Sequence, residues 1–160
     1  GIKLAKAMGA ETVMITTSPG KAADAKRLGA DEVLLSKDEA AMEKNAGGFD
    51  FLLNTIPNPH DLNPYLALLR LNGTMAIVGV LTPFSTPLVG GLLIGGRRAV
   101  AGSLIGGMPE TQEMIDFCAE HGVVSDVEMI RIQQVNEAYA RLVKNDVKYR
   151  FVIDMASLRA

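Results

Sequence analysis

The stretch ETVMITTSPGK, residues 11–21, decides the fold because it joins an apolar run to the start of a helix. Residues 11–15 are apolar and strand-like, and we expect a strand over residues 12–16. A helix is expected over residues 21–28, closed by Gly29. A strand that passes through one short polar turn into a helix is typical of α/β folds.

Outward from this unit, apolar runs and amphipathic segments alternate along the chain, with Gly or Pro at the joins. This pattern favours a doubly wound parallel sheet. Residues 49–56 form a continuous apolar run, as in strands buried on both faces of a sheet. The expected strands are residues 12–16, 31–36, 49–56, 73–80 and 98–105. The expected helices are residues 1–8, 21–28, 37–45, 62–71, 88–94 and 109–121.

The texture of the sequence changes after Gly122. Residues 123–132, a helix over residues 135–144 and a strand over residues 148–155 form a small strand-helix-strand tail, which could belong to a different sheet. We therefore divide the chain into a domain at residues 1–122 and a C-terminal segment at residues 123–160.

Composition excludes several classes of protein. The 160 residues are 48% hydrophobic and 21% charged, as in a globular domain. The net charge is −2, and Lys and Arg do not cluster with aromatic residues, so we expect no nucleic-acid partner. Apolar runs are broken before the roughly 18 residues of a membrane span, so no membrane partner is expected. The single cysteine, Cys118, agrees with a cytoplasmic location.

The polar turn at residues 16–21 has the chemistry of a phosphate-binding site. In dinucleotide folds the second strand usually ends at an acidic residue that binds the ribose 2′-hydroxyl, whereas polar or cationic groups there admit a 2′-phosphate. This turn carries Thr17, Ser18 and Lys21 and no acid. The turn therefore points to NADP rather than NAD, although Ser and Thr also favour ordinary turns and helix caps.

Other polar residues have plainer interpretations. Cys118 and His121 lie three apart on a helix, where a small buried thiol and a histidine at a helix end are commoner than a metal site. His60 is interpreted as a surface loop residue rather than a catalytic base. The pair at residues 97–98 is interpreted as two solvated arginines that bound a strand. Alternation in residues 149–151 predicts Tyr149 and Phe151 in the core and Arg150 on the other face.

The whole chain resembles the cofactor-binding domain and C-terminal tail of the zinc-type medium-chain alcohol dehydrogenases. Within that family it looks most like the cinnamyl-alcohol dehydrogenase branch, which reduces aldehydes with NADPH. Each matching piece is short, and their order makes the resemblance specific. The pieces are GIKLAKAMG (1–9), TTSPGK (16–21), LGAD (28–31), LNT (53–55), VGV (78–80), AGSLIGG (101–107), ETQEM (110–114) and DVKYRFV (146–152).

The resemblance implies roles in cofactor binding and none in catalysis or metal binding. Thr17, Ser18 and Lys21 would hold the 2′-phosphate, and Thr55 would lie beside the adenosine half. Gly79 would let the backbone approach the cofactor. The backbone of Ser103, Leu104 and Ile105 would meet the nicotinamide carboxamide. Arg150 would reach toward the pyrophosphate.

The departures from the family pattern are equally specific. The chain begins just past the family's glycine-rich turn, so the expected fold is a Rossmann-type doubly wound parallel sheet that lacks its first strand and that turn. The upstream catalytic domain, which supplies the zinc ligands in this family, is absent. One Cys and two His cannot build either zinc site. We therefore expect a fragment of a larger enzyme, inactive alone, with zinc bound outside this chain.

The resemblance implies an NADP-dependent alcohol dehydrogenase as the parent enzyme. Hydride would pass between NADP(H) and an aldehyde or alcohol held by the missing domain. The parent is expected to be a homodimer, because in the family the last strand of the sheet continues across a dimer axis. A zinc-independent quinone-type reductase and a stand-alone nucleotide-binding or interaction module remain as alternatives.

Overall fold

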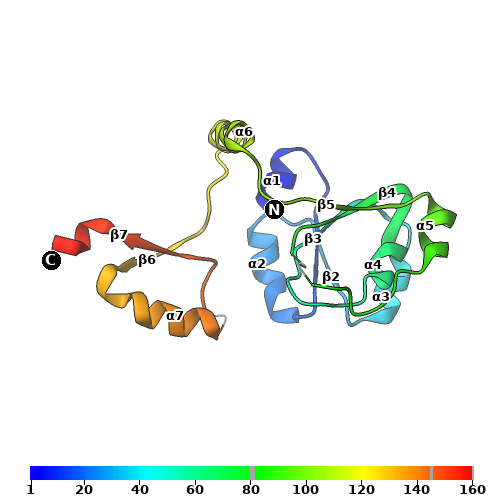
Figure 1. Cartoon of the computed structure of the whole chain (residues 1–160), viewed down its shortest axis with the longest axis horizontal. Coiled ribbons are helices and arrows are strands. Elements are labelled where there is room, and N and C mark those ends of the chain that lie inside the picture. Colours follow the sequence, from blue (N-terminus) through cyan, green and yellow to red (C-terminus); the bar gives the residue numbers. More distant parts are fainter. Residues whose placement is uncertain (80–81, 145, 160) are drawn as a thin grey trace. The chain divides into compact units, whose positions relative to one another are not determined.

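The computed structural model describes residues 1–79, 82–144 and 146–159. The chain divides into two compact units, Gly1–Glu113 and Met114–Ala160, and the division falls within helix α6 (Met108–Glu120). Figure 1 shows the first unit from α1 to β5 and the second from β6 to β7. All ladders are parallel, as expected for an α/β fold.

The first half of the first unit is a two-stranded parallel sheet with short helices. Its elements are α1 (Ile2–Ala7), β1 (Val13–Thr16), the 3-10 turn η1 (Pro19–Lys21), α2 (Ala22–Arg27), β2 (Glu32–Leu35) and α3 (Glu39–Lys44). Gly9 and Gly29 follow the first two helices with φ of 83° and 103°. This left-handed backbone costs glycine little, so both helices end where the sequence predicts.

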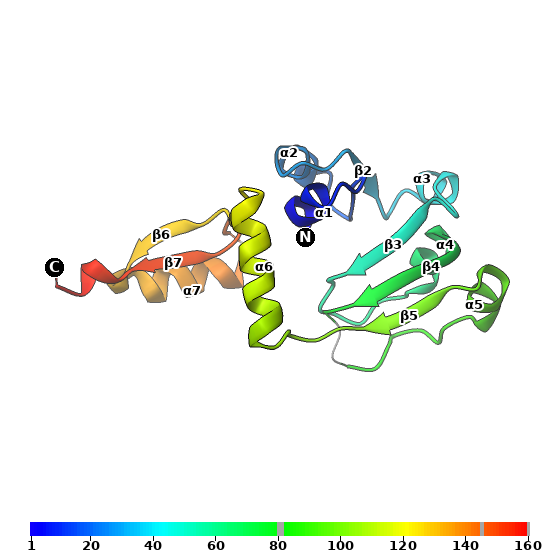
Figure 2. The ribbon, with the colours of Figure 1, turned by 90° about the horizontal axis from the view of Figure 1, so that it is seen from above.

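The second half is a three-stranded parallel sheet, ordered β3-β4-β5. Its elements are β3 (Phe49–Asn54), α4 (Asn63–Leu68), β4 (Leu69–Ile77), α5 (Gly90–Gly96) and β5 (Ala99–Gly102). Figure 2 shows the three strands side by side, with α4 and α5 beside them. The expected strand over residues 73–80 is therefore present, although Val80 lies outside the described residues.

The two sheets of the first unit do not pair with each other within the described residues. One edge of β1 and one edge of β3 are therefore without a ladder partner. On β3, Phe51 is 55% exposed and Leu53 is 49% exposed, which is unusual for a strand interior. In a complete doubly wound sheet of strand order 3-2-1-4-5-6, the first strand lies between the second and the fourth. If β1 and β3 are that second and fourth strand, a sheet without its first strand would have these two free edges.

The core of the first unit lies mainly around α4. Leu62, Leu66, Leu69 and Met75 are completely buried and form one cluster. Burying a side chain of this size contributes about 1.5–3 kcal/mol. The second cluster consists of Leu34, Met42 and Leu68, and residues of both β1 and β3 pack against it. The two sheets thus share a core although their edges do not meet.

Helix α4 is shorter than the sequence predicts, because residues 69–71 belong to the next strand. Leu69 has φ −68° and ψ 137°, which is extended backbone. The register then shifts, since Phe49 pairs with Leu69 but Phe51 pairs with Thr74. Four residues of β4, 70–73, thus stand opposite the single residue Asp50 of β3, which makes an irregular bulge with three extra residues. The apolar residues at 62–71 recur as in a helix, so the sequence predicts a helix there and a strand that starts only at Gly73.

The second unit contains the expected strand-helix-strand tail. Its elements are β6 (Glu128–Arg131), the 3-10 turn η2 (Ile132–Gln134), α7 (Val135–Val143), β7 (Phe151–Asp154) and the 3-10 turn η3 (Met155–Arg159). Arg141 of α7 contacts Glu128 at 2.7 Å and Asp146 at 3.0 Å, and its guanidinium lies 4.8 Å from the Phe151 ring centroid. These contacts tie the helix to both strands. Tyr149 is 45% exposed, so its expected place in the core is wrong: it precedes β7.

Candidate functional site

The carboxyl ends of β3, β4 and β5 meet along one edge of the three-stranded sheet. Asn54 is in register with Ile77, and Ile77 with Gly102. Two backbone bonds extend the ladders past the strands: Val78 donates to the Asn54 carbonyl at 3.0 Å, and Ser103 donates to the Ile77 carbonyl at 3.2 Å. The structure therefore brings Thr55, Gly79 and Ser103 to the edge where open α/β sheets bind ligands.

At Gly79 two backbone turns make a close contact. A Cβ atom at this position would lie 2.7 Å from the carbonyl carbon and oxygen of Thr55 and 2.7 Å from the carbonyl oxygen of Ile56. No side chain fits at that distance, so glycine is required by contact between the turns that follow β3 and β4. This requirement differs from the expected one, in which Gly79 leaves room for a cofactor.

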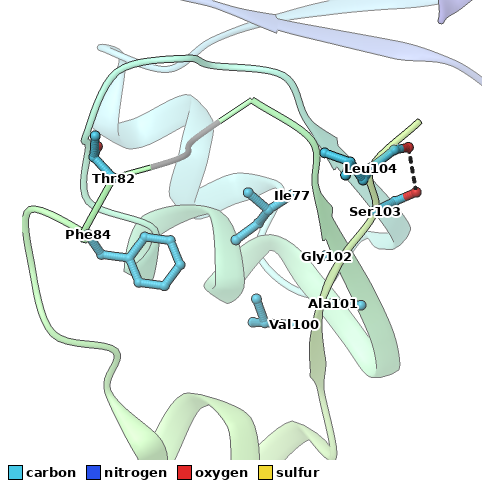
Figure 3. A pocket seen from close by; sticks show the side chains of 8 residues that line it. All are labelled: Ile77, Thr82, Phe84, Val100, Ala101, Gly102, Ser103 and Leu104. Carbon is cyan, nitrogen blue, oxygen red and sulfur yellow. Dashed lines mark hydrogen bonds between the residues drawn. The ribbon is translucent and has the colours of Figure 1, made fainter.

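An open hollow of about 630 Å³ lies beside this edge. Its lining comes from the ends of β4 and β5 and from the loop before α5: Ile77, Thr82, Phe84, Val100, Ala101, Gly102, Ser103 and Leu104. Figure 3 shows the Phe84 ring on the side of the hollow opposite Ser103 and Leu104. Thr82 and Phe84 were not identified from the sequence, because only the fold returns their loop to the sheet edge.

Residues Ser103–Leu104–Ile105 follow β5 as an exposed loop and not as the strand that the sequence predicts. Leu104 is 81% exposed and Ile105 is 89% exposed. The Ser103 hydroxyl lies 3.5 Å from the Leu104 carbonyl oxygen (Figure 3), at the limit of a hydrogen bond. Within the described residues the backbone amides of Leu104 and Ile105 have no hydrogen-bond partner. Two apolar side chains and two free donors thus face solvent at the sheet edge.

The turn after β1 presents polar groups without partners. Thr16 is buried, and its Oγ1 accepts a hydrogen bond from the Ser18 amide at 3.2 Å. The Lys21 amide donates to the Ser18 carbonyl at 3.1 Å, which closes the turn. Thr17 and Lys21 are exposed, and within the described residues their side chains have no partner. This set of donors fits a phosphate group, because hydroxyls and an ammonium all donate to anionic oxygens.

The turn after β1 contains no acidic residue. The first acidic residue after Thr16 is Asp24, which lies within α2 and pairs with Arg27 at 3.6 Å. An acid at the end of the strand would repel a 2′-phosphate and accept from a ribose hydroxyl instead. The turn is therefore suited to the phosphorylated cofactor.

Arg150 lies in the second unit, immediately before β7, and it is exposed. Its carbonyl oxygen accepts a hydrogen bond from the Glu128 amide at 3.0 Å, which fixes the backbone at this point. Arg150 therefore belongs to a different compact unit from the other candidate site residues. Its role stays a prediction.

Arg98 is not a solvated residue that bounds a strand, as expected from the sequence. It is half-buried, and its Nε donates to the Leu69 carbonyl at 2.8 Å while Nη1 donates to the Leu92 carbonyl at 3.1 Å. It therefore joins α5 to the start of β4. Arg97 is exposed, as expected.

Cys118 lies on α6, His121 directly follows that helix, and both contact side chains of α6. The Cys118 thiol is 3.6 Å from the Met114 sulfur, and the His121 ring stacks on Phe117 at 4.1 Å. Among the described residues no three His, Cys, Asp or Glu side chains are grouped to hold a metal ion. Nor does any described helix have the length and apolar character needed to cross a membrane.

Two ion pairs outside the candidate site shift the pKa values of their members. The Lys6 ammonium, with the Thr12 amide, lowers the pKa of Asp31 below its ordinary value. A bond from the Lys148 amide, helped by Arg141, lowers the pKa of Glu128, and Glu128 in turn raises the pKa of Arg141. The Arg141–Glu128 pair joins α7 to β6, and Lys6 of α1 pairs with Asp31, the residue before β2.

Comparison with known proteins gives a consistent result. A family model described as zinc-binding dehydrogenase matches residues 1–120. The aldehyde reductase YahK of Escherichia coli is 56% identical over 159 residues, which cover 99% of this chain and 45% of that protein. The chain thus spans less than half the length of this relative.

Two solved structures match nearly the whole chain. A cinnamyl alcohol dehydrogenase from Sorghum bicolor has a TM-score of 0.89 and 44% identity, covering 97% of this chain and 44% of the other. The CAD from Helicobacter pylori complexed with NADP(H) has a TM-score of 0.81 and 35% identity, with coverage of 97% and 44%. These matches confirm the Rossmann-type α/β fold that the resemblance implied.

Proposed function

The chain belongs to the zinc-binding dehydrogenase family, and on that premise we propose that it is the C-terminal, cofactor-binding part of an NADP-dependent alcohol dehydrogenase. The parent enzyme would interconvert aldehydes and alcohols by hydride transfer. The names of the relatives support this reaction, since one is an aldehyde reductase and another is a cinnamyl alcohol dehydrogenase.

The observation that carries the proposal is the turn after β1, with its free hydroxyls, its free ammonium and no acid. Thr17 and Ser18 would donate hydrogen bonds to the 2′-phosphate of NADP(H), and Lys21 would supply one positive charge. Such charge-assisted hydrogen bonds are each worth about 1.5–3 kcal/mol. NADH lacks the phosphate and would bind without these contacts.

Thr55 and Gly79 would hold the adenosine half of the cofactor. Thr55 is exposed at the carboxyl end of β3, where its hydroxyl is available to a ligand. Gly79 keeps the following turn against the backbone of Thr55 and Ile56. The absence of a side chain at Gly79 would also leave that surface open to the cofactor.

The hollow and the loop 103–105 would hold the nicotinamide. The free amides of Leu104 and Ile105 are suited to donate to a carboxamide oxygen, and Ser103 is fixed to β4 by its backbone bond. Phe84 and Leu104 would exclude water from the ring of the cofactor. Bound NADP(H) would supply the hydride, and this chain would orient the ring for transfer.

The second unit would complete the cofactor site and join the catalytic domain. Arg150 would place its guanidinium toward the pyrophosphate, and residues 123–160 would belong with the catalytic domain while residues 1–122 bind NADP. The zinc ion and the substrate would be held by parts of the enzyme outside this chain. No residue of this chain would act as a catalytic group, so the chain alone would be inactive.

The parent enzyme would be a cytoplasmic homodimer without nucleic-acid or membrane partners. The net charge of −2 supports the lack of a nucleic-acid partner, the single cysteine supports the cytoplasmic location, and the family resemblance supports the homodimer. The free edges of β1 and β3 would accept a strand from residues that precede this chain in a longer polypeptide. Analytical ultracentrifugation of the natural polypeptide that contains this chain would test the dimer.

Two other functions are less well supported. A zinc-independent quinone-type reductase would use the same cofactor site, but the relatives compared above are named as alcohol dehydrogenases or an aldehyde reductase. A stand-alone nucleotide-binding module would need a complete diphosphate site within these residues, and the described turns supply only the two ends of the cofactor site.

Calorimetric titration of the natural polypeptide that contains residues 1–160 tests the proposal, with NADPH, NADH and 2′-AMP as ligands. We expect NADPH to bind about tenfold or more tighter than NADH, and Lys21→Ala to remove this difference. Lys44→Ala is the control, because Lys44 is an exposed lysine at the end of α3. Equal affinity for NADPH and NADH would overturn the assignment, as would failure of an aldehyde to oxidise bound NADPH.

A further inference from the structure

The turn that follows β3 is closed by a side-chain network that the sequence did not predict. Asn54, the last residue of β3, is only 8% exposed. Its Oδ1 accepts from the Ile56 amide at 3.2 Å, and its Nδ2 lies 2.9 Å from Nε2 of His60. Nδ1 of His60 lies 2.8 Å from the Asn58 carbonyl oxygen. His60 lies in a loop, as the sequence predicts, but it is half-buried and both of its ring nitrogens have partners.

Hydrogen-bond chemistry determines the proton positions in this network. The Asn58 carbonyl only accepts, so Nδ1 of His60 must carry a hydrogen. Because Oδ1 of Asn54 already accepts from Ile56, the amide nitrogen of Asn54 faces the ring, and Nε2 of His60 must accept. Both constraints give the same tautomer, with the hydrogen on Nδ1. A cationic ring would place a donor against the Asn54 amide donor.

The His60 ring is also held by the core. It meets Tyr65 of α4 edge to face, with the ring centroids 5.8 Å apart and an angle of 86°. Tyr65 packs against both hydrophobic clusters of the first unit. His60 therefore joins the core beneath α4 to the end of β3 and to the middle of the turn.

Thr55 lies between the two residues that this network fixes. The backbone of Asn54 is bonded to Val78, its side chain is bonded to Ile56, and the backbone of residues 55–56 touches Gly79. We propose that His60, acting through Asn54, is a positioning residue that directs Thr55 toward the adenosine half of NADP(H). This inference rests on the proposed function and assigns a residue that contacts no ligand itself.

Two substitutions separate the polar role of His60 from its packing role. His60→Phe keeps an aromatic ring against Tyr65 but removes both hydrogen bonds. His60→Gln loses the ring but presents one acceptor and one donor, which replace Nε2 and Nδ1. The matched control is His121→Phe, since His121 directly follows α6 and its Nδ1 lies 3.0 Å from the carbonyl oxygen of Phe117 in that helix.

The readout is the dissociation constant for NADPH and for 2′-AMP, measured by calorimetry on the natural polypeptide that contains this chain. We expect His60→Phe to raise the dissociation constants of both ligands by the same factor, about 5- to 30-fold. The dissociation constants of His60→Gln should stay closer to those of the wild type. A double-mutant cycle then combines His60→Phe with Thr55→Ala. If His60 acts through Thr55, the double variant binds no more weakly than the weaker single variant.

The outcomes are distinguishable. Additive losses in the cycle, or a His60→Phe variant that melts earlier but binds NADPH and 2′-AMP as the wild type does, would overturn the inference and leave His60 a structural residue. If His60→Phe does not fold, the comparison of His60→Gln with Thr55→Ala carries the same test. A wild-type protein that binds neither ligand would refute the proposed function, and the inference would fall with it.

Discussion

Replacing Gly79 by alanine tests whether the carboxyl edge of the sheet is assembled as the structure indicates. The new Cβ would lie 2.7 Å from three backbone atoms of Thr55 and Ile56, whereas ordinary contact begins at 3.4 Å. The two turns must therefore separate by about 0.7 Å. Overpacking of this kind costs about 1–3 kcal/mol. For a folding unit of about 150–250 residues the melting temperature falls by about 2–4 °C per kcal/mol, or about 2–12 °C in all.

The assay is thermal unfolding of the natural polypeptide without cofactor, followed by circular dichroism, together with calorimetric binding of 2′-AMP. We expect Gly79→Ala to melt earlier and to bind 2′-AMP more weakly, because the turn that carries Thr55 is displaced. Gly95→Ala is the matched control. Nothing lies within 4 Å of its added Cβ in α5, and alanine favours a helix over glycine by about 1 kcal/mol.

The reasoning is refuted if Gly79→Ala melts at the wild-type temperature and binds 2′-AMP normally. A normal melting temperature combined with weaker NADPH binding would support a different role. Gly79 would then be required for the approach of the cofactor, as the sequence suggests, and the contact between the turns would be incidental.

Three further outcomes are expected from the contacts described above. Arg98→Met should lower the free energy of unfolding by about 2–4 kcal/mol in urea denaturation, because it removes two charge-assisted bonds to carbonyls, whereas Arg97→Met should change it little. The lowered pKa of Asp31 stabilises the folded state above its ordinary value of 3.8, and this stability is lost as the pH falls through the folded value. Asp31→Asn should therefore be less stable than the wild type at pH 7, with a smaller fall between pH 7 and pH 3, and an equal fall would contradict the assignment. The preference for NADPH over NADH should decrease when ionic strength rises from about 0.1 M to about 1 M, since the screening length falls from about 10 Å to about 3 Å. Calorimetry at increasing NaCl concentration measures this preference. A preference that does not change with salt would exclude the Lys21 charge as its source.

Most of the secondary structure could be predicted because its signals are local. Glycines with positive φ end α1 and α2, and Asp38 accepts a hydrogen bond from the Ala41 amide at the start of α3. The end of α4 could not be predicted, because the bulge in β4 depends on pairing with β3. The length of the strand expected over residues 98–105 was overestimated for the same reason. Residues 103–105 are apolar enough for a strand, but they extend past the ladder and lie in solvent.

Some residues of the candidate site could likewise be predicted from the sequence and others could not. The turn at Thr17, Ser18 and Lys21 is contiguous, so its residue types alone indicated a phosphate site. The hollow at Phe84 could not be predicted, because it joins the loop before α5 to the ends of β4 and β5. The network of Asn54 and His60 lies within one turn, and it depends on how that turn folds back on itself. Their chemistry depends on distances of about 3 Å between groups that no sequence spacing encodes.

The sequence by itself determined the α/β class, the order of the elements and the polar turn, because periodicity, glycine positions and residue type act within a few residues of the chain. Only the tertiary structure decided that β1 and β3 leave two free edges, that Gly79 is required by a neighbouring backbone, and that His60 is joined to Asn54. The physical reason is that strand pairing, steric contact and hydrogen bonding depend on separation in space, which folding sets for residues distant in the chain.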